Sequence, residues 1–247
     1  MSGLRLFLIA LQFLTCIPVR LRDLPDALEI GRSVLFYPLV GLLIGTVLAL
    51  LNLALQNGSD ALRAAVVLAV WVAMTGALHL DGLADSADAW VGGHGDRQRT
   101  LDIMKDPRSG PAAVSAVVLV LLLKFAALAV LLQGGAWPAL LLAPLLGRAA
   151  LLGLLLSTPY VRAGGMGAAI AGHLPRKTAL ALLLVTAAGI CLLADGWKAL
   201  LAVLVVGFLL RRAFLARLGG MTGDMLGAAV ELAEAAALLA LALKTQS

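Results

Sequence analysis

The sequence predicts an all-α fold, a polytopic transmembrane helical bundle with about seven spans and a short N-terminal helix that is interfacial or re-entrant. Hydrophobic residues make up 62% of the 247 residues and charged residues only 13%, whereas about a quarter of a soluble domain is charged. The apolar residues form long stretches rich in Leu and Ala, not the alternating segments of about ten residues that build membrane β-barrels. No soluble domain separates them, so residues 1–247 are predicted to form a single integral membrane domain.

The first apolar stretch, residues 4–17, is shorter than the ~20 residues that cross a bilayer, which favours an interfacial or re-entrant helix. Seven apolar stretches follow it, and tight polar breaks join the first six of them into three helical hairpins. The predicted spans are residues 34–55, 61–78, 112–132, 137–157, 178–194, 197–210 and 226–243.

The basic residues orient this bundle. Nearly all Arg and Lys residues lie in four longer loops, and the tight breaks carry almost none. By the positive-inside rule the longer loops face the cytoplasm, and an odd number of spans then places the C-terminus on the opposite side. The net charge of +5 is therefore a topology signal, and no basic patch with interleaved aromatic residues indicates nucleic acid. The four loops are residues 18–33, 79–111, 158–177 and 211–225.

A charged segment at residues 79–110 contains six of the 14 acidic residues. Asp81, Asp85 and Asp88 have the spacing i, i+4, i+7, which places three carboxylates on one face if they lie on a helix. Such a cluster is repulsive without a cation, and a hard divalent ion such as Mg2+ binds carboxylate and phosphate oxygens together. The alternative is a solvated loop, but the position directly after an apolar helix favours a functional site at the membrane interface.

A second segment combines a glycine-rich turn with two acids. Gly219, Gly220 and Gly223 allow the backbone to approach a ligand closely, and they precede a helix N-terminus, where phosphate is favoured. Asp224 and Glu231 are seven residues apart and so share a helix face, with Glu231 inside an apolar stretch. A charge at that depth is unfavourable by ~3 kcal/mol unless it is paired or hydrated.

Two cations within the predicted spans, Lys124 and Arg148, are candidate partners for this charge. They either form a buried ion pair that holds helices in register or contact a substrate phosphate, and the sequence does not separate these roles. His79, beside the carboxylates, is a candidate ligand or proton carrier, or equally a hydrogen-bonding neighbour of the site.

Five collinear segments resemble the cobalamin synthase family, whose members are adenosylcobinamide-GDP ribazoletransferases. Together the segments extend from the first helix to the last, which makes the match far more specific than any one motif. They are LQFLTCIPV at 11–19, RSVLFYPLVGLLIG at 32–45, HLDGLADSADAWVGG at 79–93, LDIMKDPRSG at 101–110 and GGMTGDMLGAAVE at 219–231.

The resemblance implies a Mg2+-dependent multi-pass enzyme of the bacterial inner membrane, with its active site on the cytoplasmic face. It implies that the enzyme joins adenosylcobinamide-GDP to alpha-ribazole, or to alpha-ribazole 5'-phosphate, and releases GMP. The implied catalytic residues are Asp81, Asp85, Asp88, Lys105, Arg108 and Asp224, with Asp81, Asp85, Asp88 and Asp224 as candidate metal ligands. The candidate substrate-binding residues are His79, Gly82, Asp106, Gly219, Gly220, Thr222, Gly223 and Glu231, together with Lys124 and Arg148.

One departure from the family pattern lies in the fourth of these segments, residues 101–110. Pro107 stands where the family usually has Ser, and Ser109 stands where it has an apolar residue. A side-chain hydroxyl at position 107 therefore has no role in this chain, and the loop backbone is stiffer.

In the expected reaction, Mg2+ held by the carboxylates neutralises the diphosphate and the cations stabilise the charge on departing GMP. Asp224 either completes the metal site or accepts the proton of the attacking hydroxyl. One alternative function is a CDP-alcohol-type phospholipid phosphotransferase, although the DGxxAR and GxxxDxxxD spacing of that family is absent. Another is a cation-coupled transporter, which predicts inverted repeats and broken helices at the midplane. The lipid bilayer is an expected partner, and the sequence leaves a homo-oligomer open.

Overall fold

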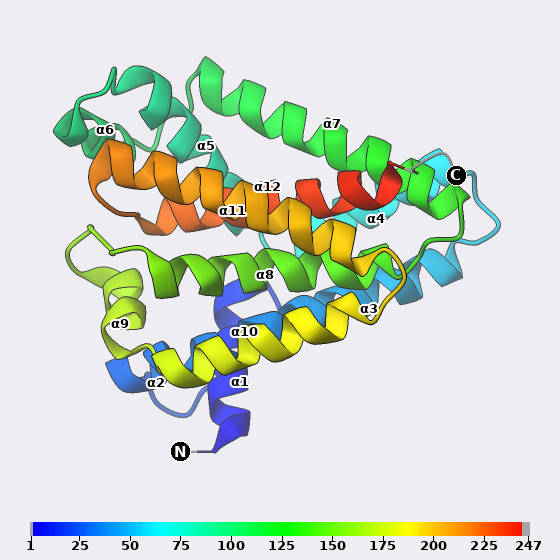
Figure 1. Ribbon diagram of the computed structural model, residues 1–247, viewed down its shortest axis with the longest axis horizontal. Helices are drawn as coiled ribbons and strands as arrows, with labels where there is room; N and C mark the ends of the chain where they lie inside the picture. Colours follow the sequence, from blue (N-terminus) through cyan, green and yellow to red (C-terminus); the bar gives the residue numbers. More distant parts are fainter. Residues whose placement is uncertain (1, 244–247) are drawn as a thin grey trace.

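The computed structural model describes residues 2–243, and all regular elements in that part of the chain are helical. The chain runs through α1 (Gly3–Leu14), α2 (Ala27–Ser33), the 3-10 turn η1 (Val34–Phe36), α3 (Tyr37–Ala54), α4 (Asp60–Met74), α5 (Leu78–Gly92), α6 (Arg97–Ile103), α7 (Pro111–Gln133), α8 (Ala139–Ser157), α9 (Gly165–His173), α10 (Arg176–Cys191), α11 (Gly196–Leu218) and α12 (Gly223–Ala242). The long helices lie side by side, and α1 crosses their direction (Figure 1).

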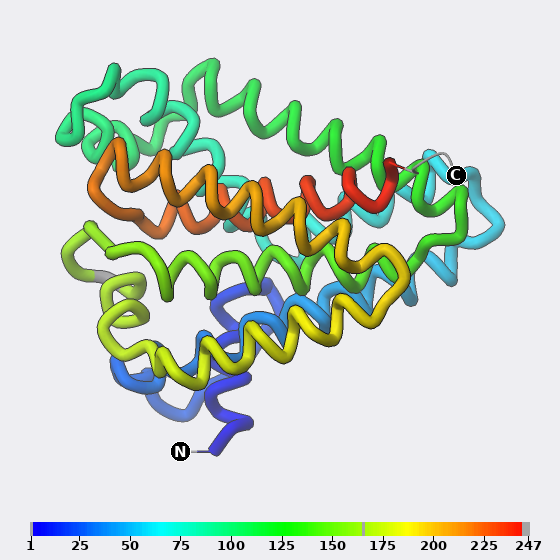
Figure 2. Tube along the Cα trace, in the orientation of Figure 1, coloured from blue at the N-terminus to red at the C-terminus, as the bar shows by residue number. Residues whose placement is uncertain are grey.

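The prediction of a polytopic helical bundle is confirmed. Five helical segments are long and apolar enough to cross a membrane, and two bent helix pairs raise the number to seven if each pair is one span. The tight turns that follow α3, α7 and α10 gather at the right of the view, and the segments rich in basic residues gather at the left (Figure 2). The bundle therefore has one charged end and one end of short turns, as the sequence predicts.

The charged segment at residues 79–111 differs from the predicted loop because it is mostly helical. The apolar helix before it ends at Met74, and α5 begins at Leu78 with its axis turned by 86°. Gly76 and Ala77 have positive φ angles of 58° and 56°, a conformation that no α-helix continues. The three carboxylates nevertheless share one helix, because the chain re-enters the helical conformation before it reaches them.

The sixth predicted span also differs from the prediction. The predicted span 197–210 extends to Leu218, so the loop before α12 shrinks to residues 219–222. Arginines near this end remain helical because their long side chains reach the polar end of the bundle while the stems cover apolar surface. Short helices also occupy the other two basic loops, α2 in 18–33 and α9 in 158–177.

The two most buried long helices, α8 and α12, form the centre of the bundle. Helix α3 approaches α8 so closely that a Cβ on Gly41 would lie 2.4 Å from the Pro144 carbonyl oxygen, and one on Gly45 would lie 2.5 Å from that of Leu140. Small residues at a helix contact bring the backbones together, which is how membrane helices gain packing energy without a hydrophobic driving force between them.

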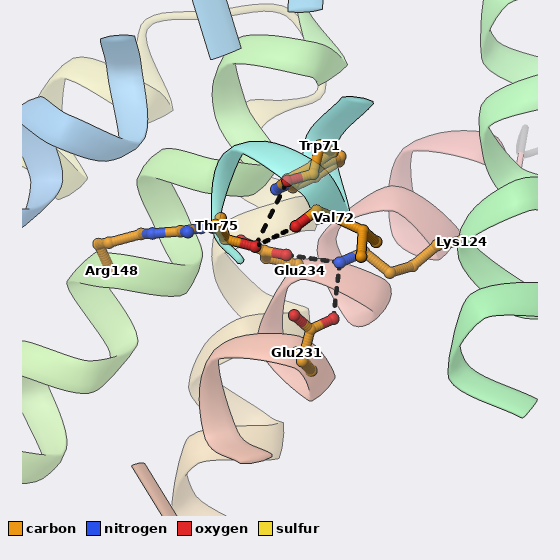
Figure 3. Close-up of polar contacts among 7 residues, drawn as sticks. All are labelled: Trp71, Val72, Thr75, Lys124, Arg148, Glu231 and Glu234. Atoms are coloured by element: carbon orange, nitrogen blue, oxygen red, sulfur yellow. Dashed lines mark hydrogen bonds and ion pairs between the residues drawn. The ribbon is translucent and has the colours of Figure 1, made fainter. Parts of the chain in front are cut away.

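A buried network of four charges joins three helices in this centre (Figure 3). The amino group of Lys124 on α7 donates to Glu231 at 2.8 Å and to Glu234 at 2.5 Å, both on α12. Arg148 on α8 donates to the other oxygen of Glu234. The ammonium group also lies 4.3 Å from the ring centroid of Trp71 on α4. Two cations and two carboxylates leave no net charge in the interior, which is the condition for burying them.

We expect the single substitution Glu234→Leu to destabilise the protein by about 3–5 kcal/mol, because it leaves Arg148 buried without a counter-charge. The double variant Glu234→Leu/Arg148→Met should recover much of this loss, since both members of the pair are gone. Unfolding in detergent would measure both.

Asp60→Ala is the matched control, because its ion pair with Arg63 is partly exposed and Arg63 keeps its bonds to Asn52. A change of at most about 1 kcal/mol is expected there. A double variant at the buried pair as unstable as the single one would contradict the role of charge pairing.

Candidate active site

Helix α5 carries the three predicted carboxylates, and α12 lies directly against it. A Cβ on Gly82 would lie 2.6 Å from the carbonyl oxygen of Asp224 and 3.2 Å from its Cα. A Cβ on Gly227 would lie 3.4 Å from the Cα of Gly82. These glycines let the two helices touch through their backbones, which places Asp224 beside the Asp81–Asp85 face although the residues are far apart in sequence.

Asp224 forms an ion pair with Arg162, in which Nη1 donates to Oδ2 at 2.9 Å. The connection between α8 and α9 brings Arg162 there through a short parallel bridge to the glycine-rich turn. The Met221 amide donates to the Pro159 carbonyl at 2.8 Å, and the Val161 amide donates to the Met221 carbonyl at 2.9 Å. The bridge therefore fixes this arginine at the first turn of α12.

The glycine-rich turn is shaped by backbone requirements. Gly219 has a φ of 70° and ends α11, as glycine commonly does at helix C-termini. A Cβ on Gly220 would lie 2.4 Å from the Pro159 carbonyl oxygen, so the bridge requires glycine there. Thr222 is the N-cap of α12 and accepts a hydrogen bond from the Met225 amide at 3.3 Å. Gly223 then opens the helix, whose N-terminal amides favour phosphate.

Asp88 differs from the other two carboxylates of α5 because its oxygens are engaged by backbone. The Ala113 amide donates to Oδ1 at 2.9 Å, and the Gly110 amide donates to Oδ2. Asp88 thus satisfies amides at the start of α7, where a helix leaves its first N–H groups without partners. The structure places the side chain in the predicted cluster and shows that it also anchors the loop before α7.

That loop, residues 104–110, carries the predicted cations. The guanidinium of Arg108 holds both oxygens of Asp106, at 2.9 Å and 2.6 Å, and this pair lowers the pKa of Asp106 to about 2. Lys105 is exposed. The loop begins beside the glycine-rich turn, since the Thr222 hydroxyl lies 3.6 Å from the sulfur of Met104. Both motif loops therefore meet at the charged end of the bundle.

Charge interactions connect the carboxylates of α5 with Asp224 and Arg162 in one site. The charge of Asp85 is repelled by those of Asp81, Asp224 and Asp88 and attracted by that of Arg162. Within residues 2–243, neither the Asp81 carboxylate nor the Asp85 carboxylate forms a hydrogen bond or ion pair. In the same part of the chain, no three His, Cys, Asp or Glu side chains come close enough to enclose a metal ion. Two unengaged carboxylates one helical turn apart still suit Mg2+, which commonly uses one or two carboxylates together with water and phosphate.

A pocket with a volume of about 200 Å³ lies beside the contact between α5 and α12, and α1, α3, α8 and α9 also line it. Asp81 and Gly223 are exposed members of its lining, and Tyr37, Leu155 and Ile170 are among its buried members. Charged groups therefore stand at one side of a largely apolar pocket.

The remaining predicted residues lie deeper. Glu231 is buried and bonded to Lys124, and Arg148 is bonded to Glu234, so the structure shows the ion-pair alternative for both cations. His79 is also buried, with Arg148 and Lys124 close enough to repel positive charge on its ring. Both ring nitrogens of His79 and two guanidinium nitrogens of Arg148 lack partners in the described chain. Ordered water commonly satisfies such groups.

Two residues of the site were not singled out from the sequence. Arg162 and Tyr160 belong to a loop whose arginines were used only to orient the bundle. The Tyr160 hydroxyl lies against the start of α12, and burial raises its pKa, so it remains a hydrogen-bond donor at neutral pH. The sequence signal was a Pro-Tyr-x-Arg run before paired glycines, a pattern that does not reveal its distant partner.

The helical bundle and its charged end define the class of the protein, a polytopic membrane protein whose carboxylates and helix N-terminus suit phosphate chemistry. Residues 6–242 match the family model described as cobalamin-5-phosphate synthase. The chain belongs to this family and is a transferase of cobalamin biosynthesis.

Similar proteins are named adenosylcobinamide-GDP ribazoletransferase. The relative from Pseudomonas putida (strain GB-1) is 60% identical over 96% of this chain and 98% of its own length. The relative from Pseudomonas fluorescens (strain Pf0-1) is 59% identical over 95% and 98%. That from Stutzerimonas stutzeri (strain A1501) is 59% identical over 96% and 97%. No solved structure matches the chain. The family predicted from the sequence is thereby confirmed.

We predict that Asp88→Ala lowers stability by about 1–2 kcal/mol, because it removes the acceptor for two amides at the start of α7. Proteolysis between residues 104 and 110 should become faster. Asp85→Asn should leave both measurements near wild type, since no contact holds that carboxylate. Equal stability of the Asp88 variant and wild type would contradict the anchoring role.

Proposed function

We propose that this chain is an adenosylcobinamide-GDP ribazoletransferase that joins adenosylcobinamide-GDP to alpha-ribazole or its 5'-phosphate and releases GMP. The observation that carries the proposal is the contact between α5 and α12, which brings unengaged carboxylates beside a helix N-terminus and an arginine. A diphosphate substrate needs these groups, because its charge must be neutralised and its phosphorus aligned with the attacking hydroxyl. The names of the similar proteins support the substrates.

Asp81 and Asp85 are the residues that would hold Mg2+, because both are unengaged and lie on one face of α5. Once bound, the ion would neutralise phosphate charge and polarise the phosphorus–oxygen bonds. Asp88 lies on the same face, but its backbone bonds assign it first to positioning the loop before α7.

Arg162 and Asp224 have two further roles, phosphate binding and proton acceptance. A guanidinium can neutralise either a carboxylate or a phosphate, so an arriving phosphate would draw Arg162 away from Asp224. The freed carboxylate would then accept the proton of the ribazole hydroxyl as its oxygen bonds to the phosphorus next to the cobinamide arm. The bond between that phosphorus and GMP breaks, and Lys105 and Arg108 would stabilise the charge on GMP.

The location that we propose is the bacterial inner membrane, with the charged end of the bundle in the cytoplasm. The positive-inside rule supports this orientation, because the basic segments gather at that end. Bent helix pairs also occur in transporters, but the family and its named relatives favour the transferase over a cation-coupled transporter or a CDP-alcohol phosphotransferase.

Purified protein in liposomes should convert adenosylcobinamide-GDP and alpha-ribazole to a cobalamin and GMP, and removal of Mg2+ with a chelator should stop the reaction. Asp81→Ala and Asp85→Ala should each lower kcat by about 10³-fold, since a metal supplies several kcal/mol of charge stabilisation. Asp102→Ala is the matched control, because this exposed acid lies on α6 outside the site. Wild-type turnover unaffected by chelation would reject the metal, and no turnover at all would reject the reaction.

Cysteine labelling tests the orientation. In a variant with Cys16 and Cys191 replaced by serine, a reporter cysteine at exposed Leu192 or Gly134 should react with an impermeant reagent in intact spheroplasts. A reporter at Gln98 on α6 should react only after the membrane is opened. The reverse pattern would invert the proposed topology.

A further inference from the structure

We infer that the pocket beside Asp81 and Asp224 is the binding site for the base of the ribazole substrate, a specificity-determining pocket that takes a flat, largely apolar bicyclic heterocycle. This inference rests on the proposed function. Four features of the pocket support it: its size, its mostly apolar lining, the Tyr37 hydroxyl in that lining, and the charged residues that also line it.

The volume of the pocket matches only one part of the two substrates. An apolar cavity of about 150 Å³ binds a single benzene ring, and pockets for drug-sized ligands measure ~300–1,000 Å³. A volume of about 200 Å³ therefore suits a fused bicyclic ring. It is far too small for a corrinoid, so the cobinamide part of the other substrate must lie outside.

The lining suits a flat apolar ring. Leu151 and Leu155 of α8 and Ile170 of α9 are buried around the pocket. Phe13 of α1 and Tyr37 of α3 also line it, with ring centroids 6.0 Å apart and planes 29° from parallel. Aliphatic and aromatic walls of this kind bind heteroaromatic rings by burial and ring contacts.

Two buried polar side chains, Tyr37 and His79, belong to this otherwise apolar lining. Tyr37 is only 1% exposed, and its hydroxyl has no hydrogen-bond partner among the described residues. Buried tyrosine hydroxyls usually have one. A benzimidazole base attached to ribose through one nitrogen keeps its second ring nitrogen as an acceptor, which is the partner that a phenolic hydroxyl can donate to.

The charged residues of the lining indicate where the ribose of the substrate would lie. Asp81, Gly223 and Asp224 belong to the same lining as the apolar residues. A nucleoside whose base fills the apolar part would hold its ribose toward these groups, where the proposed reaction takes place. The observations thus connect the pocket to the nucleoside and leave the diphosphate to the charged groups outside.

Substitutions that change the size of the pocket test the inference. Leu155→Phe should raise KM for alpha-ribazole at least tenfold and leave KM for adenosylcobinamide-GDP unchanged, because pocket size discriminates substrates by about 10–200-fold per methylene. Leu155→Ala should gain activity with a riboside of a larger, tricyclic base, a gain that a misfolded variant cannot show. Leu122→Phe on α7, where the side chain is 56% exposed, is the matched control and should resemble wild type.

Tyr37→Phe tests the hydrogen bond. Wild type should prefer a benzimidazole riboside over the indole riboside, which lacks the acceptor nitrogen, by about tenfold or more, and the variant should lose this preference. The base pocket would be overturned, with the proposed function intact, if wild type turns over and the variants behave as follows. KM for alpha-ribazole is unchanged in Leu155→Phe, Leu155→Ala gains no activity with the larger base, and Tyr37→Phe keeps the preference for the benzimidazole riboside. Absence of turnover by wild type would instead remove the proposed function itself. A lipid acyl chain found in the pocket with alpha-ribazole present would also overturn the inference.

Discussion

The buried pairing of Lys124, Glu231, Glu234 and Arg148 is the constraint on which the rest of the bundle depends. Each charge alone would be strongly unfavourable in an apolar interior, so the three helices that carry them are compatible with burial only when they meet in one register. That register fixes α12 along α7 and α8. It also places the N-terminus of α12, two turns before Glu231, at the charged end of the bundle.

Close backbone contact between α5 and α12 then brings the residues of the site together. Gly82 and Gly227 let α5 and α12 touch, and the same contact brings Asp224 to the carboxylates of α5. Any larger side chain at Gly82 would collide with the backbone of Asp224 at 2.6 Å, so the site and the helix packing depend on the same glycine. The backbone bridge at Met221 adds Arg162 from a third part of the chain.

The bend between α4 and α5 also helps to assemble the site. A straight helix through residues 61–92 would carry its carboxylates away from the bundle, whereas the 86° turn at residues 75–77 folds α5 back over α12 and α7. The bond from Asp88 to the start of α7 closes this arrangement on one side. The predicted catalytic segments thereby become one surface, with an apolar pocket beneath it.

The sequence by itself determined the helical membrane class, the two ends of the bundle, the family and the set of candidate acids, because long apolar runs, basic loops and motif spacing are local properties of the chain. It could not show the bend after Met74, the length of α11 or the partners of Asp88, since these depend on contacts between distant segments. The role of Arg162 was hidden for the same reason: an arginine in a basic loop has no distinguishing local pattern. Only the tertiary structure decided that Lys124 and Arg148 pair with buried glutamates. Helix register, and not spacing along the sequence, determines which opposite charges meet in a low-dielectric interior.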